Sequence, residues 1–260
     1  MKVFLPTFII LTCIVSLVIG NIHWNDKISD AGVSQPGTKQ SKDESSKPSP
    51  DNEELVKYIG NWPKESKELY NKRLSEGKPF KILMVGSNSL GNEEYNLPDD
   101  LADQLNHVYG NTVHVDGLIY EMMSSQFVSQ NKQKDLIEAK ADLILFEPFT
   151  LKDNGNVAIE DSLGNITSVI KDVTAVNEET QFILQPPNPL YNATYYPNQV
   201  DELEKYAKDN DIPYLNHWSN WPDQTSDKMI DLLNEDRELP NEKGYKIWSL
   251  YLEEFFIKQI

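Results

Sequence analysis

The chain has 260 residues, of which 24 are Lys or Arg and 41 are Asp or Glu, giving a formal net charge of −17. This charge argues against nucleic acid or an anionic membrane surface as a partner of the folded part, because phosphate groups would be repelled. Cys13, the single cysteine, lies in an apolar run near the N-terminus, so the rest of the chain cannot form a disulfide.

The N-terminal residues predict a segment that meets the membrane. Lys2 precedes a largely apolar run, whose length is near the lower limit for spanning a bilayer and the upper limit for a signal-peptide core. We expect residues 1–20 to be an export signal or an N-terminal membrane anchor, with the protein secreted or held at the outer face of the membrane. Residues 21–52 have too few apolar side chains to bury and are predicted to be a disordered linker.

Strand and helix patterns alternate over residues 53–260. Apolar runs predict five strands, at 82–85, 111–115, 142–147, 181–184 and 212–215. Helical spacing is found at 53–62, 66–76, 99–109, 120–139 (with a polar interruption at 129–131), 159–173, 199–210 and 243–256. Because such alternation implies right-handed crossovers, we expect one α/β domain, a three-layer α/β/α sandwich around a five-stranded parallel sheet.

Polar side chains follow the predicted strands. The first strand runs directly into Gly86-Ser87-Asn88-Ser89, and His217 follows the last one. Carboxyl ends of parallel strands form the edge at which ligands bind. A serine, a histidine, amides and carboxylates at that edge would supply the nucleophile, base, oxyanion donors and orienting acid of acyl transfer. A plain turn at Gly86–Ser89 is the alternative, and for His217 the alternative is packing in the run H-W-S-N-W-P.

The element order and these loops resemble the SGNH/GDSL hydrolases, whose flavodoxin-like domain carries Ser, Gly, Asn and His in four sequence blocks. The likeness covers most of the chain after Pro79, and its most specific part is Pro240-Asn241-Glu242-Lys243-Gly244-Tyr245 before the last helix. The first block of the family is G-D-S-L. If the turn here has one extra residue, Ser89-Leu90 matches the S-L of that block. Without a gap Asn88 falls on the serine position, and Ser87 is a further alternative.

The resemblance implies a role for each matching residue. Ser89 would be the nucleophile, and Gly117 and Asn154 would hold the oxyanion, although the glycine of the third block is absent. The histidine of the last block falls on Leu239, which cannot accept a proton. Two interpretations stay open. His217 has become the base, with Asp236 or Asp223 as the orienting acid, or the domain binds without cleaving.

The resemblance implies an extracellular serine esterase that cleaves an ester of a cell-envelope carbohydrate or lipid. Leu239 motivates the alternative, a catalytically impaired domain that binds glycan. We expect a small-molecule or glycan ester as substrate, no nucleic acid partner, a monomer, and no cofactor or metal, since no His/Cys cluster has zinc spacing. A group of late aromatic residues would form either a sugar-stacking wall or ordinary packing: Tyr191, Tyr195, Tyr196, Trp218 and Trp221.

Overall fold

The computed structural model describes residues 52–92 and 94–259. The predicted export segment at 1–20, and all of the predicted linker except its last residue, lie outside this part of the chain. Within the part that is described, no helix combines the length and apolar character needed to cross a bilayer.

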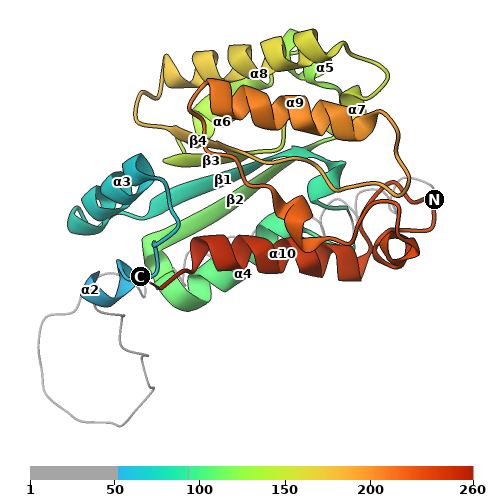
Figure 1. Ribbon diagram of the computed structural model, residues 1–260. Coiled ribbons are helices and arrows are strands. Elements are labelled where there is room, and N and C mark those ends of the chain that lie inside the picture. Colours follow the sequence, from blue (N-terminus) through green and yellow to red (C-terminus); the bar gives the residue numbers. More distant parts are fainter. Residues whose placement is uncertain (1–51, 93, 260) are drawn as a thin grey trace, which may run out of the picture. The chain divides into compact units, whose positions relative to one another are not determined.

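The core of the domain is a parallel sheet with the strand order β2-β1-β3-β4 (Figure 1). Its strands are β1 (Phe80–Ser87), β2 (Val113–Tyr120), β3 (Leu143–Phe146) and β4 (Gln181–Leu184). The expected parallel sheet is therefore confirmed, but the prediction of a fifth strand at 212–215 is wrong. This segment makes one isolated bridge, between Tyr214 and Leu184. Pro213 lacks an N–H group and cannot extend the ladder.

Helices cover both faces of the sheet. Their bounds are α2 Asn52–Leu55, α3 Lys64–Ser75, α4 Leu97–Tyr109, α5 Ser124–Ser129, α6 Gln133–Ala139, α7 Thr150–Asp153, α8 Ile159–Thr174, α9 Tyr196–Asp209 and α10 Glu242–Phe256. Short 3-10 turns are η1 Asn88–Leu90, η2 Gly110–Thr112, η3 His217–Asn220 and η4 Asp227–Leu232. Figure 1 shows α5 to α9 on one side of the strands, with α4 and α10 on the other. This is the expected three-layer arrangement.

The alternation of side chains along β1 builds the two cores. Ile82 and Met84 belong to one apolar cluster, with buried residues of α4 and α10. Leu83 and Val85 belong to the other, with buried residues of α8. Successive side chains of a strand point to opposite faces, so a continuous apolar run is what a strand covered on both faces requires.

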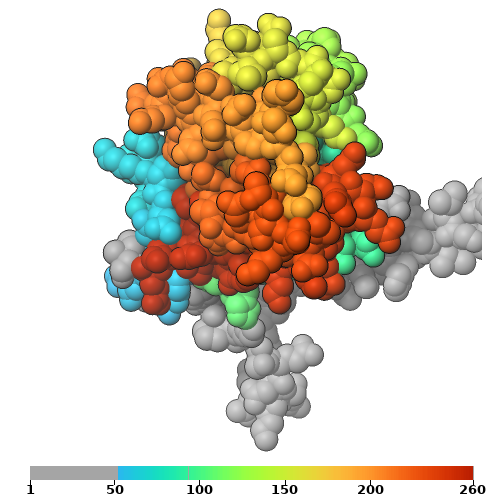
Figure 2. Space-filling model, turned by 45° about the vertical axis from the view of Figure 1, so that its right-hand side comes forward, coloured from blue at the N-terminus to red at the C-terminus, as the bar shows by residue number. Residues whose placement is uncertain are grey.

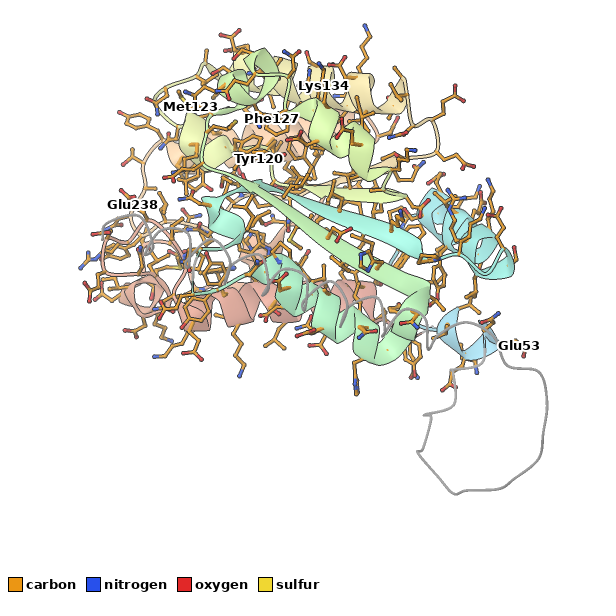
Figure 3. The ribbon with its side chains drawn as sticks, turned by 180° about the vertical axis from the view of Figure 1, so that it is seen from behind. Glu53, Tyr120, Met123, Phe127, Lys134 and Glu238 are labelled. Carbon is orange, nitrogen blue, oxygen red and sulfur yellow. The ribbon has the colours of Figure 1, made fainter. Side chains whose placement is uncertain are left out.

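Two helix expectations were wrong because tertiary contacts override the local pattern. The 53–62 segment is helical only at its start, in α2, and Trp62 then packs between the rings of Tyr70 and Phe80. The 120–139 segment does not begin as a helix, because Tyr120 ends β2 and packs its ring against Phe127 of α5 (Figure 3). The polar interruption at 129–131 is confirmed as the gap between α5 and α6.

Gly117 lies inside β2, opposite Met84, and not in a loop after the strand as expected. A Cβ atom at this position would come within 2.6 Å of Pro98 Cβ, in the first turn of α4. Only glycine therefore lets the helix start approach the strand this closely. Gly117 therefore has a packing function. Its partner Met84 comes three residues before Ser87, the last residue of β1.

We expect Gly117→Ala to lower the free energy of unfolding by about 1–3 kcal/mol, because the added methyl overpacks the contact with Pro98. The matched control is Gly164→Ala in α8, where a Cβ meets nothing within 4 Å. This variant should gain roughly 0.5–1 kcal/mol from the better helix propensity of alanine. Urea unfolding measures both, and equal stability of Gly117→Ala and the parent would contradict the packing role.

Candidate active site at the carboxyl edge of the sheet

The serine turn follows β1 without an intervening loop. Ser87 ends the strand, and its Oγ accepts a hydrogen bond from the Ser89 N–H at 3.2 Å, which caps η1. Asn88 is the first residue of η1. Both serines are 0% exposed, and the Ser89 Oγ makes no hydrogen bond to the described residues. The sequence thus delivers two hydroxyl groups to the sheet edge, in a closed environment.

Glu147, the residue after β3, lies directly against this turn. Its Oε2 accepts a hydrogen bond from the Ser87 N–H at 2.6 Å, while its Oε1 has no partner among the residues described. Burial raises the pKa of Glu147 to about 7, although the hydroxyl and N–H of Ser87 and the N–H of Phe149 lower it. A carboxyl group that titrates near neutrality beside a serine is a candidate general base.

Sequence reasoning treated Glu147 only as the end of a strand. The available signal was a carboxylate directly after the apolar run Leu143–Phe146, a strand buried along its whole length. Gly86 is what lets this side chain approach β1, since a Cβ there would lie 2.7 Å from Glu147 Cβ. The pairing of Gly86 with Glu147 could not be read from spacing along the chain.

Further buried polar groups extend the cluster toward β4. Gln185 accepts a hydrogen bond from Trp248 Nε1 at 3.1 Å, and its own Nε2 is buried without a partner. Asn188 donates to the Glu238 carbonyl at 3.1 Å, and its Oδ1 is likewise unpaired. Buried polar atoms without partners are rare in folded proteins and often mark a site that takes a ligand or water. Ser89, Glu147 and Gln185 each carry such an atom and follow the ends of β1, β3 and β4.

His217 is a packing residue, and no hydrogen bond joins its ring to Ser87 or Ser89. It is 0% exposed and stacks on Trp248, with ring centroids 3.9 Å apart. Its Nδ1 accepts a hydrogen bond from Trp221 Nε1 at 3.1 Å, so we assign the proton to Nε2, which lies 2.9 Å from the Pro186 carbonyl. Burial lowers the pKa of His217 to about 3. The role of base for His217 stays a prediction, and this geometry argues against it.

The other predicted site residues are not joined to the serine turn by hydrogen bonds. Asp236 and Asp223 are exposed, and Asp223 accepts hydrogen bonds from the backbone N–H and the hydroxyl of Thr225. Asn154 ends α7, where its N–H donates to the Thr150 carbonyl. Their assigned roles stay predictions. In the described chain, no three His, Cys, Asp or Glu side chains are placed to hold a metal ion.

The burial of His217 predicts a stability signature. Its folded pKa, about 3, lies below the ordinary 6.5, so between these values the unfolded chain binds a proton that the folded chain excludes. Stability is therefore lost as the pH falls from 6.5. His217→Phe keeps a ring but leaves Trp221 Nε1 unpaired, and should cost about 1–3 kcal/mol at pH 7.5. Urea unfolding should show that the difference in free energy of unfolding between the parent and His217→Phe is smaller at pH 4.5 than at pH 7.5. A difference that does not change with pH would contradict the burial of a neutral His217.

Comparison with known proteins identifies the fold. No protein-family model and no curated protein matches the sequence. Among solved structures, a GDSL-like lipase candidate from Parabacteroides merdae matches with a TM-score of 0.55 at 12% identity, over 68% of this chain and 94% of that one. A carbohydrate esterase of family 3 from Talaromyces cellulolyticus matches with a TM-score of 0.55 at 13% identity, over 66% of this chain and 94% of that one.

An acetylxylan esterase from Geobacillus stearothermophilus gives a TM-score of 0.52 at 14% identity, over 68% of this chain and 93% of that one. At these sequence identities the matches show the fold and nothing further about this chain. The sheet described above agrees with the resemblance seen in the sequence. This chain has the α/β fold of the GDSL/SGNH lipases and esterases.

Proposed function

We propose that this domain is an ester hydrolase in which the Ser87–Ser89 turn supplies the nucleophile and Glu147 acts as the base. The observation that carries the proposal is the buried Glu147 carboxyl beside Ser87, with its pKa raised to about 7. The shared fold with lipases and esterases supports the reaction class. Glu147 takes the place that the family pattern gives to a histidine and that Leu239 cannot fill.

Ser87 is the nucleophile we favour, since its backbone N–H donates to Glu147 Oε2 and this contact places the residue against the carboxyl group. As Ser87 Oγ attacks the acyl carbon, ionised Glu147 accepts the hydroxyl proton and then returns it to the departing alkoxide. A water molecule, activated by the same carboxylate, releases the acyl group from the serine. The Ser89 N–H, which donates to Ser87 Oγ in the free protein, is a donor for the developing oxyanion. Ser89 is the alternative nucleophile.

Access to this site requires movement of the loops that cover it, because both serines and Glu147 are fully buried. Figure 2 brings the right-hand side of Figure 1 forward and shows orange and red segments, which follow β4 in the chain, gathered on this face. Asn188, bonded to the Glu238 carbonyl, and Tyr191, bonded to Asp227, fasten these segments to each other. Substrate entry would open such contacts.

The substrate we propose is an ester of an extracellular carbohydrate or lipid. The apolar segment at 1–20 supports a location outside the cell, either secreted or anchored at the outer face of the membrane. The acetylxylan esterase among the similar structures is one example of this fold on a carbohydrate ester.

Binding without cleavage is the second candidate function, and one specific observation favours it. The only imidazole near this edge that the sequence offered as a base, His217, has both ring nitrogens engaged. Leu239 stands at the family's histidine position. If Glu147 does not serve as a base, the edge keeps polar groups that contact a ligand but none that activates a serine.

Hydrolysis of p-nitrophenyl acetate tests the proposal. We expect Ser87→Ala and Glu147→Gln each to lower kcat/KM by about 10²-fold or more, because general-base catalysis typically contributes that much. The wild-type rate should rise with pH through about 7 as Glu147 ionises. The matched control is Ser168→Ala, a serine of α8 bonded to the Gly164 carbonyl. Ser89→Ala distinguishes the two nucleophiles.

Two outcomes would contradict the assignment. Equal rates in the parent, Ser87→Ala and Ser89→Ala would remove both serines from the reaction. Absence of turnover in the wild-type protein, with the fold intact by circular dichroism, would favour the binding function.

A further inference from the structure

A hollow of about 570 Å³ lies between the loop that follows β4 and the loop around η3. Its volume falls within the range of small-ligand sites. The side chains that line it are mostly aromatic, proline or neutral polar: Pro189, Asn192, Ala193, Thr194, Pro197, Trp218, Trp221, Pro222, Asp223, Gln224 and Thr225. None of these lining residues is a lysine or an arginine, so the hollow offers no cationic group to a phosphate or carboxylate.

The apolar part of this wall is held in place before any ligand arrives. Trp218 donates from Nε1 to the Pro187 carbonyl at 2.7 Å, and its ring packs against Tyr196 at 5.5 Å between centroids. Trp221 donates from Nε1 to His217 at 3.1 Å. A half-buried indole with a fixed ring plane is a flat, rigid surface, which favours a ligand with one apolar face.

The polar part carries an unsatisfied acceptor. Gln224 Oε1 is buried and has no hydrogen-bond partner in the described residues. The Asp223 carboxylate is partly used, since Oδ1 accepts from the N–H and hydroxyl of Thr225. This oxygen is already buried and unpaired, and an alkyl chain in the hollow would offer it no donor. A ligand with hydroxyl donors would satisfy it.

A series of bonded residues connects the hollow to the polar cluster at the sheet edge. Gln185, a member of that cluster, is followed directly by Pro186, whose carbonyl is bonded to His217. His217 in turn accepts the hydrogen bond from Trp221 of the hollow wall. One peptide bond and two hydrogen bonds thus join Gln185, the residue after β4, to Trp221 in the lining of the hollow.

We propose that this hollow binds a neutral sugar unit, with the C–H face of the ring on Trp218 and a hydroxyl donating to Gln224 Oε1. Resting on the proposed ester hydrolysis, the inference names the substrate class: the hollow holds the carbohydrate part of the ester. A sugar ring matches the lining because one molecule presents both an apolar face and hydroxyl edges. A fatty-acid ester would match only the apolar half.

Isothermal titration calorimetry on the full-length protein tests the assignment, with xylohexaose and chitohexaose as neutral probes and dodecanoate as the lipid probe. We expect saturable binding of at least one oligosaccharide and none of dodecanoate. Trp218→Ala and Gln224→Leu should each weaken the binding by tenfold or more. The matched control is Gln130→Leu, the same change in the turn between α5 and α6, which should bind as the parent does. Circular dichroism confirms that each variant is folded.

The inference is overturned if wild-type protein binds neither oligosaccharide, if it prefers dodecanoate, or if folded Gln224→Leu binds as tightly as the parent. Failure of the proposed function is seen separately. If wild-type protein binds an oligosaccharide but does not hydrolyse p-nitrophenyl acetate, the sugar site is supported and the proposed esterase function is contradicted. If it hydrolyses the ester but binds no oligosaccharide, the esterase function is supported and the sugar site is contradicted.

Discussion

The hydrogen bond from the Ser87 N–H to the Glu147 carboxylate is the contact on which the candidate site depends. It joins the ends of β1 and β3, two neighbouring strands, and fixes the turn that carries both serines. The arrangement is costly, because a pKa raised from 4.5 to about 7 lowers the stability of the folded state at neutral pH by on the order of 3 kcal/mol. A buried acid that the fold maintains at this cost, with one oxygen unpaired, is hard to explain as packing alone.

The rest of the fold explains why polar groups gather at this edge. Residues 82–85 of β1, all of β3 and residues 182–184 of β4 are apolar because helices cover both sides of these strands, so a polar side chain can enter this part of the sheet only where a strand stops. β1, β3 and β4 all stop at the same edge, and Ser87, Glu147 and Gln185 stand at those three ends.

The sequence predicted the parts of this structure that depend on local pattern. The bounds of β4 at 181–184 agree with the structure, and the helix at 159–173 is α8 with one further residue. Apolar runs and helical spacing determine these elements directly. The fifth strand failed because a strand needs hydrogen bonds along its length, and Pro213, whose carbonyl accepts one from the Leu184 N–H, has no N–H group to donate. Gly117 was misplaced because its requirement comes from Pro98, which lies on another element.

The candidate site was harder to predict, since its residues interact through space. His217 has the chemistry of a base, but only the positions of Trp221, Trp248 and Pro186 show that its nitrogens are occupied. Glu147 has no motif of its own and becomes notable through burial against Ser87. A family pattern read along the chain cannot show which buried carboxyl group lies against the serine turn in the folded protein.

The most direct test of this account is the ionisation of Glu147 itself. Carbon-13 NMR of the glutamate side-chain carboxyls, with Glu147→Gln to assign the resonance, follows this group as the pH is raised from 4 to 9. The account predicts that the assigned carbon titrates near pH 7. A carbon that titrates at the ordinary value of an exposed glutamate would contradict it, because a carboxylate ionised that readily is not the buried base that the serine turn requires.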